Sequence, residues 1–239
     1  MMKLSIIIPV YNEEKTIAQI IKKVLKVKLS AEKEIIIVND GSTDMSASII
    51  TQMDLPSKAK VKIIHHKKNQ GKGAAVITGM QKASGQYIVI QDADLEYDPV
   101  DIIKLLALLE QNKGHVIYGT RLKRLPNLKR DEKTPLFLIH YLGNKVLSFT
   151  TSILYSTWIT DMECCYKLFP REALKDMHLQ AKGFEFEPEI TAKLLKKGYK
   201  IKEIPISTNP RSHKEGKKLH AIHDGKKALW TLLKYKFMD

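Results

Sequence analysis

The sequence predicts an α/β protein with a mostly parallel, Rossmann-like central sheet and helices on both faces. Three observations predict it. Short runs rich in β-branched residues alternate with helical patterns through the first half of the chain, as in successive βαβ units. The runs Leu4–Pro9 and Glu34–Val38 read as nearly continuous apolar runs, as strands covered on both faces do. The 239 residues, 44% hydrophobic and 28% charged, can bury a core and exclude a collagenous or low-complexity chain.

The first half of the chain contains the clearest strands and helices. The expected strands are Leu4–Val10, Glu34–Val38, Val61–His65, Tyr87–Gln91 and Val116–Tyr118. The expected helices are Glu14–Val27, Asp44–Met53, Lys72–Ala83 and Pro99–Asn112. We expect Pro99 in the first turn of its helix, where the missing N–H does no harm.

The pattern changes after Gly119. The stretch Arg121–Thr134 is a basic loop that is long for a simple connection. The remaining expected elements are a long helix at Leu136–Tyr155, a polar turn at Thr160–Cys164, a helix at Pro188–Lys197, a strand at Tyr199–Ile206 and a helix at Gly225–Phe237. No repeat or boundary interrupts the chain, so we expect a single domain over residues 1–239.

Cysteine usage and the start of the chain both favour a cytoplasmic protein. Cys164 and Cys165 are adjacent and cannot form a disulfide framework, so we expect them to pack as small apolar residues in a reducing compartment. Residues Met1–Leu4, where the first strand begins, are too few for a signal peptide. The histidines show no zinc-binding spacing, and we expect them on the surface.

The net charge of +14 is concentrated in two segments. Lys193–Asp239 contains 13 basic and 4 acidic residues, and Arg121–Pro135 contains 6 and 2. We expect these segments to face an anionic partner, either nucleic acid, phospholipid headgroups or a phosphate-bearing substrate. The alternative is a basic surface without a partner.

Acidic residues follow three of the expected strands. Ligands of an open parallel sheet bind beyond the carboxyl ends of its strands, and Glu13, Asp40 and Asp92 lie at such ends. A dinucleotide-binding Rossmann domain would need a glycine-rich turn after the first strand, which is absent. A P-loop is excluded because the G-K-G at 71–73 lacks the upstream glycine and the following Ser or Thr.

Asp92, Asp94 and Glu96 alternate after the fourth expected strand. From a strand end, this spacing would direct two or three carboxylates to one point, which suits a divalent cation with a diphosphate as co-ligand. Without a cation, such carboxylates would repel one another. The alternative for the triplet alone is a solvated acidic turn, and Asp40 could likewise be only an Asx-turn residue.

Eight segments carry a resemblance to a known family. They are I-P-V-Y-N-E-E at 8–14, V-N-D-G-S-T-D at 38–44, N-Q-G-K-G-A-A at 69–75, D-A-D-L-E at 92–96, G-T-R at 119–121, T-D at 160–161, G-F-E-F-E at 183–187, and Arg211 with E-G-K-K at 215–218. In this order, they resemble the family 2 glycosyltransferases of the GT-A fold, and among these the polyprenyl-phosphate (dolichol-phosphate) mannose and glucose synthases.

The resemblance implies a nucleotide-sugar site in the first half, residues 1–120, for a UDP- or GDP-sugar. The residues implied for the nucleoside are Pro9, Tyr11, Glu13 and Asp40. Asp92 and Asp94 would bind the diphosphate through Mg²⁺ or Mn²⁺. Glu96 would be a further metal ligand, although some synthases have Gln there. Lys72 would contact the diphosphate or would only begin a helix.

The second half, residues 121–239, would then bind a polyprenyl-phosphate acceptor. Arg121 and Arg211 resemble the family's phosphate-facing arginines, whose planar geometry suits phosphate. Arg130 is a looser match, for which a solvated loop is the alternative. Asp161 would orient substrate or cap a helix.

The G-F-E-F-E segment would extend the acceptor site. If it were strand-like, Phe184 and Phe186 would face one side, and Glu185 and Glu187 the other. We expect Glu187 to be the functional carboxylate. The alternative is that both phenylalanines lie in the core and both glutamates only line the turn before Pro188.

The implied reaction is inverting transfer of a mannose or glucose to a lipid phosphate. The catalytic residues would be Asp94, Arg121, Asp161, Glu187 and Arg211. Since a phosphate monoester is already anionic at neutral pH, no strong general base is needed. A sugar-hydroxyl acceptor, as in cell-envelope polysaccharide synthesis, is the alternative, and it would require Asp161 or Glu187 as the base.

A polyprenyl phosphate lies in a membrane, so we expect peripheral association with the cytoplasmic face of an anionic membrane. Leu136–Tyr155 and Gly225–Phe237 mix apolar and aromatic residues with Lys, as interfacial helices do. Core packing of Trp230 and Leu233 is the alternative for the second helix. A nucleic-acid-binding module is a distant alternative, because only 7% of residues are aromatic and the acidic strand ends would be unexplained.

Overall fold

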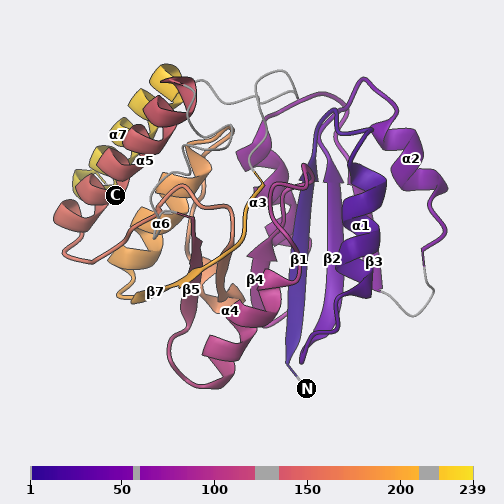
Figure 1. Cartoon of the computed structure of the whole chain (residues 1–239), viewed down its shortest axis with the longest axis horizontal. Helices are drawn as coiled ribbons and strands as arrows, with labels where there is room; N and C mark the ends of the chain where they lie inside the picture. Colours follow the sequence, from indigo (N-terminus) through magenta and orange to yellow (C-terminus); the bar gives the residue numbers. More distant parts are fainter. Residues whose placement is uncertain (1, 56–59, 122–134, 210–220, 239) are drawn as a thin grey trace.

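The structure, a computed structural model, describes residues 2–55, 60–121, 135–209 and 221–238. One seven-stranded sheet runs through this part of the chain, in the order β3-β2-β1-β4-β6-β5-β7 (Figure 1). The strands are β1 (Lys3–Val10), β2 (Glu32–Asn39), β3 (Lys60–His65), β4 (Tyr87–Ile90), β5 (Val116–Thr120), β6 (Lys167–Pro170) and β7 (Ile201–Pro205). The predicted α/β class with a mostly parallel sheet is confirmed.

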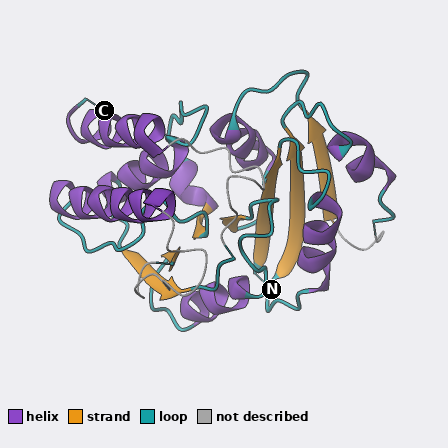
Figure 2. Ribbon diagram, turned by 45° about the horizontal axis from the view of Figure 1, so that its top comes forward, coloured by secondary structure: helices purple, strands orange, loops and turns teal. Residues whose placement is uncertain are grey.

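The first four strands form the parallel part of the sheet. β1 pairs in parallel with β2 and β4, and β2 pairs in parallel with β3. Helices α1 (Ile17–Lys26), α2 (Ser46–Gln52) and α3 (Lys72–Lys82) connect them. The chain reverses direction across the sheet after β3, so right-handed crossovers require α3 on the face opposite α1. Figure 2 shows this arrangement of helices around the strands.

The buried core explains why the strand sequences are so apolar. Ile6, Ile7 and Ile8 of β1 are at most 1% exposed, and the same holds for Ile36 and Ile37 of β2. Both faces of these strands therefore lie against helices rather than water. Cys164 and Cys165 are also buried and are not joined in a disulfide, as the sequence predicts.

β6 is an element that the sequence analysis did not predict. Its four residues lie between β4 and β5 and are antiparallel to both. β6 leads into a short 3₁₀ helix at Arg171–Leu174, which was also unpredicted. Insertion of β6 separates the parallel pair β5 and β7 from the rest of the sheet.

Several predicted boundaries shift by a few residues. Helix α4 is Asp101–Glu110, so Pro99 precedes the helix instead of lying in its first turn. The long helix α5 is Pro135–Leu154, and α6 is Phe186–Lys196. The last helix, α7, is Ala221–Phe237 and begins before the predicted Gly225. Helices α5, α6 and α7 pack together at the end of the molecule that also holds β7 (Figure 1).

Candidate active site

The end of β1 begins the candidate site. Pro9 is buried within the strand, and Tyr11 and Glu13 are half-buried just beyond it. The Glu13 backbone N–H donates to Ser46 Oγ over 2.8 Å, and Thr16 Oγ1 donates to the Glu13 carboxylate over 2.9 Å. These bonds fix the turn between β1 and α1, which is where the sequence predicts nucleoside contacts.

Asp40, at the end of β2, holds the loop before α3. Its carboxylate is 2% exposed and accepts backbone N–H bonds from Gln70 at 3.0 Å and Gly71 at 2.8 Å. His66 Nδ1 lies 2.7 Å from the same carboxylate, and His66 Nε2 contacts Thr78 Oγ1 at 3.0 Å. The expectation of surface histidines is therefore wrong for His66, whose side chain is 8% exposed. The predicted nucleoside role of Asp40 stays a prediction.

Gly71 brings this loop close to the segment before α6. Its φ of +100° lies in a region that side chains avoid, and a Cβ here would collide with the carbonyl oxygen of Lys182. The same carbonyl accepts the Ala74 N–H at 3.1 Å. Because Gly71 caps α3, the close approach places Lys72, the first residue of the helix, beside α6.

Lys72 joins two of the predicted site residues, Asp92 and Glu187. Its Nζ lies 2.9 Å from Asp92 Oδ1 and 3.1 Å from Glu187 Oε1. Burial alone would lower the pKa of Lys72, but the charges of Asp92 and Glu187 outweigh burial and hold that pKa well above its usual value. Lys72 is thus a fixed cation where the resemblance predicts a diphosphate.

The acidic turn after β4 differs from its predicted geometry. β4 ends at Ile90, so the following carboxylates lie on a turn, in which Leu95 has a φ of +64°, and not on a strand end. The Glu96 N–H donates to Asp94 Oδ1 over 3.0 Å, and Asp92 faces Lys72. Within the described ranges, no three metal-type side chains gather as a binding cluster.

Two carboxylates at this turn still fit a divalent cation that completes its coordination with diphosphate oxygens and water. Asp92 and Asp94 supply hard oxygen donors of the kind that Mg²⁺ and Mn²⁺ prefer. The metal roles of Asp92, Asp94 and Glu96 stay predictions.

Arg121 and Asp161 form an ion pair at the end of β5. Arg121 Nε donates to Asp161 Oδ2 and Arg121 Nη2 donates to Asp161 Oδ1, each over 2.8 Å, and the Arg121 backbone N–H also donates to Oδ2 over 2.8 Å. Asp161 is fully buried. Burial would raise the pKa of Asp161, but the Arg121 charge and these bonds hold the pKa below its usual value. Asp161 is therefore a carboxylate that orients Arg121.

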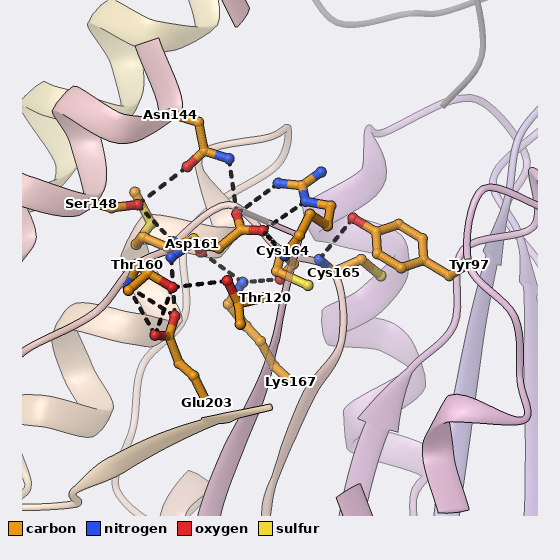
Figure 3. A network of polar contacts seen from close by, with 12 residues as sticks. Tyr97, Thr120, Asn144, Ser148, Thr160, Asp161, Cys164, Cys165, Lys167 and Glu203 are labelled. Carbon is orange, nitrogen blue, oxygen red and sulfur yellow. Dashed lines mark hydrogen bonds and ion pairs between the residues drawn. The ribbon is translucent and has the colours of Figure 1, made fainter. Parts of the chain in front are cut away.

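The inner face of α5 supports this pair. Asn144 Nδ2 donates to Asp161 Oδ1 over 2.8 Å, and Ser148 Oγ donates to Asn144 Oδ1 over 3.2 Å. Ser148 Oγ in turn accepts the Met162 N–H at 2.9 Å. Figure 3 shows these side chains reaching from the helix toward Asp161.

Glu203 of β7 supports the same segment from the sheet. Its carboxylate accepts the N–H groups of Thr160 at 2.9 Å and Asp161 at 3.0 Å, and the Thr160 hydroxyl at 2.8 Å (Figure 3). Thr160 Oγ1 also lies 2.8 Å from Thr120 Oγ1. Three elements, α5, β5 and β7, thus fix the position of the Arg121–Asp161 pair.

The predicted strand-like alternation around Glu187 is wrong. Phe186 begins α6, and Glu187 lies in the first turn of this helix. Phe186 is fully buried, and Phe184 is half-buried with its ring 5.9 Å from Lys72 Nζ. Helical periodicity, rather than alternation, turns Glu187 toward Lys72.

Two of the predicted site residues lie where the structure describes no residues, and three residues near the site were not predicted from the sequence. Arg130 and Arg211 lie outside the described residues. The sequence analysis did not single out Asn144, although an amide side chain within an otherwise apolar helix is a signal of a buried polar contact. It did not single out Glu163, an acid inside the otherwise apolar stretch before β6, or Glu203.

Comparisons with known proteins agree with the fold and with the sequence segments. The model of the family described as Glycosyl transferase family 2 matches residues 5–177. A UDP-N-acetylglucosamine–dolichyl-phosphate N-acetylglucosaminyltransferase of Methanococcus voltae is 33% identical over 219 residues, which cover 85% of this chain and 84% of that protein. A dolichyl-phosphate beta-glucosyltransferase of Trichomonas vaginalis is 29% identical over 218 residues, which cover 85% of this chain and 63% of that protein.

Solved structures show the same architecture. Glucosyl-3-phosphoglycerate synthase of Mycobacterium tuberculosis, in complex with Mn²⁺, UDP and glucosyl-3-phosphoglycerate, superposes with a TM-score of 0.73 at 17% identity. The match covers 100% of this chain and 81% of that one. The same enzyme with Mg²⁺ and UDP gives a TM-score of 0.72 at 17% identity, covering 100% and 80% of the two chains.

Proposed function

This chain belongs to glycosyl transferase family 2, and from that premise we propose that it transfers a hexose, with inversion, from a nucleotide sugar to a polyprenyl phosphate at a membrane surface. The predicted family and GT-A fold are confirmed. Both named relatives act on dolichyl phosphate according to their names. Because those names specify N-acetylglucosamine and glucose, we infer a UDP-sugar of this type in preference to GDP-mannose.

The observation that carries the proposal is the proximity of two charged clusters. Lys72, Asp92 and Glu187 form the first, which we call the donor cluster, and Arg121 and Asp161 form the second, the acceptor cluster. The adjacent residues Cys164 and Cys165 lie near both clusters. The charges of Asp92 and Lys72 act on the Cys165 thiol, and those of Asp161 and Arg121 act on the Cys164 thiol. A reaction between two phosphate-bearing substrates needs cationic groups at two neighbouring points.

In this proposal the first half of the chain binds the donor. Pro9, Tyr11, Glu13 and Asp40 surround the nucleoside, and Lys72 contacts the diphosphate. Asp92 and Asp94, with Glu96 nearby, would hold Mg²⁺ or Mn²⁺, which supplies positive charge to the leaving diphosphate.

The second half binds the acceptor. Arg121 faces the acceptor phosphate in an orientation that Asp161 fixes, and Arg130 and Arg211 add to the same anion site. Since the phosphate oxygen is the nucleophile, positioning and charge take the place of a general base.

A sugar-hydroxyl acceptor fits this geometry less well. Such an acceptor would require a carboxylate free to take a proton, and Asp161 and Glu187 were the predicted bases. Asp161 is bonded to Arg121 and Asn144, and Glu187 is paired with Lys72. Both oxygens of Asp161 are therefore occupied, and Glu187 is held beside Lys72 through Oε1.

The outer face of α5 supports action at a membrane. It carries a helical stripe of exposed apolar side chains, which are Leu138, Ile139, Leu142, Val146, Phe149 and Ile153. The helix has no acidic residue, and Lys145 flanks the stripe. Trp230 of α7 is 62% exposed, so core packing is wrong for that residue. These features suit an anionic lipid surface. No described helix has the length and hydropathy of a membrane span.

The test is sugar transfer to a short-chain polyprenyl phosphate, measured in parallel with an oligosaccharide acceptor. UDP-glucose, UDP-N-acetylglucosamine and GDP-mannose serve as donors, with Mn²⁺ present. We expect a glycosylated lipid phosphate from a UDP-sugar. Transfer to the oligosaccharide alone would contradict the proposed acceptor.

A further inference from the structure

Glu163 is a buried acid whose chemistry the proposed mechanism does not use. It follows Asp161 by two residues, in the turn that leads to β6. Its Oε1 atom is buried and makes no hydrogen bond in the described part of the chain. Glu187 is only 3% exposed, and its Oε1 pairs with Lys72. Its Oε2 is also buried and makes no hydrogen bond with the described residues. Buried polar atoms almost always have a partner, so two such oxygens in one site point to a ligand.

The charges around Glu163 show where it lies in the site. Glu163 follows Asp161 of the acceptor cluster by two residues, and the charges of Glu187, Arg121 and Asp161 are all close enough to affect its pKa. Lys167 of β6 also acts on it. Glu163 therefore lies near residues of both clusters.

In the proposed reaction, the transferred sugar must lie between the donor diphosphate and the acceptor phosphate. In the donor, its anomeric carbon is bonded to the diphosphate, and in the product the same carbon is bonded to the acceptor phosphate. With the diphosphate at Lys72 and Asp92 and the acceptor phosphate at Arg121, the sugar ring lies between the clusters. A carboxyl group is a natural partner there, since sugar hydroxyls both donate and accept hydrogen bonds.

We propose that Glu163 binds a hydroxyl or acetamido group of the transferred sugar and so helps to select that sugar, a role that rests on the proposed function.

The protonation state of Glu163 suits this contact. Burial raises the pKa of Glu163 to about 8, and the Glu187 charge adds to this rise, while Lys167 and Arg121 oppose it. At neutral pH the group therefore holds a proton and can donate as well as accept. A neutral carboxyl group also avoids repulsion from the donor diphosphate.

The test separates binding of the sugar from binding of the nucleotide. Calorimetry gives the affinities of UDP, UDP-glucose and UDP-N-acetylglucosamine, with Mn²⁺, for the wild type, Glu163→Gln and Glu163→Ala. The sugar contribution is the ratio of the UDP-sugar affinity to the UDP affinity. We expect Glu163→Ala to reduce this ratio about tenfold or more for the preferred sugar, because a site built to bind a polar group loses discrimination without it. The UDP affinity should stay within about twofold of wild type.

Controls make the result specific. Glu172→Ala, an exposed acid in the 3₁₀ helix, should leave every ratio unchanged. Glu163→Gln keeps the shape and hydrogen-bonding capacity of the carboxyl group, so its sugar contribution should lie between those of wild type and Glu163→Ala. Thermal unfolding confirms that each variant is folded.

The possible failures differ from one another. An unchanged sugar contribution in a folded Glu163→Ala variant would overturn this inference alone, since the nucleotide would still bind. A wild-type protein that binds neither UDP nor GDP would overturn the proposed function and this inference with it.

Discussion

The carboxyl groups in this site differ in protonation state because their immediate partners differ. Asp161 is fully buried yet ionised, because Arg121 and Asn144 satisfy both of its oxygens. Glu163 lies nearby, has no such partner for its buried Oε1, and has a pKa raised to about 8. The same functional group thus serves as a fixed anion at one position and as a neutral hydrogen-bonding group two residues later.

The raised pKa of Glu163 predicts a pH-dependent stability difference. The folded pKa of about 8 exceeds the usual value of 4.5, so the folded state binds more protons than the unfolded state between these pH values. The free energy of unfolding therefore falls as pH rises through this window. Glu163→Gln cannot titrate and should gain melting temperature relative to wild type between pH 5.5 and pH 8.5, as measured by thermal unfolding. A difference that does not change with pH would contradict this prediction.

We expect Lys72 to contribute to binding of the donor nucleotide and not only to begin helix α3. Lys72→Met leaves Asp92 and Glu187 without their shared cation. We expect its affinity for UDP to fall about tenfold or more, or about 1.4 kcal/mol, with a smaller loss for Lys72→Arg. Lys82→Met, which removes an exposed lysine at the other end of α3, is the matched control. Equal calorimetric affinities for Lys72→Met and Lys82→Met would exclude a donor role for Lys72.

Sequence predicted the identity of these residues better than their contacts. Asp92, Asp161 and Glu187 were found because they lie in the D-A-D-L-E, T-D and G-F-E-F-E segments that carry the family resemblance. Their ion pairs with Lys72 and Arg121 join residues from different elements, so no local spacing encodes them. Glu163 was missed because burial and the absence of a partner are properties of the folded chain.

At the scale of elements, the parallel strands were predictable and β6 was not. The β1 and β2 sequences are dominated by β-branched residues that prefer a covered strand. β6 has four residues, including a lysine and a terminal proline, which are weak strand signals. It forms because β4 and β5 offer pairing edges on both sides. Its Lys167 is fully buried, and Nζ donates to the Met162 and Cys164 carbonyl oxygens.

Helix α5 has two faces with separate roles, and Asn144 tests the inner one. Asn144→Ala removes the bond to the buried Asp161 carboxylate, which should cost about 1–3 kcal/mol of folding free energy. Since Arg121 is then less well oriented, turnover should fall while UDP affinity stays unchanged. Thr150→Ala, a half-buried position on the same helix, is the control. The role of Asn144 would be refuted if both variants had the same turnover and melting temperature.

At the scale of the whole molecule, three parts of the fold have separate roles in the proposed reaction. The carboxyl ends of β1, β2 and β4 present the residues proposed for the donor. The Arg121–Asp161 pair, proposed for the acceptor, is held between β5, β7 and α5. The outer face of α5 lies on the same helix as Asn144, so a membrane at that face would lie near the acceptor cluster.

The stripe on α5 predicts binding to anionic vesicles. Val146 and Phe149 are 55% and 61% exposed, and Val146→Glu with Phe149→Glu places two negative charges in the stripe. We expect the double variant to co-sediment at least about tenfold more weakly with phosphatidylglycerol-containing vesicles, because it loses both apolar contact and charge attraction. The control is Ile103→Glu on α4, where Ile103 is 43% exposed. Equal vesicle binding by the double variant and the control would rule out this face.

Binding of a nucleoside diphosphate that depends on a divalent cation is the central claim. Calorimetry of UDP with the wild type and with Asp94→Asn, each in Mn²⁺ and in EDTA, tests it most directly. We predict that EDTA weakens UDP binding by the wild type about tenfold or more, and that Asp94→Asn binds equally weakly in both conditions. Wild-type affinity that is the same in EDTA as in Mn²⁺, or no UDP or GDP binding at all, would contradict the account.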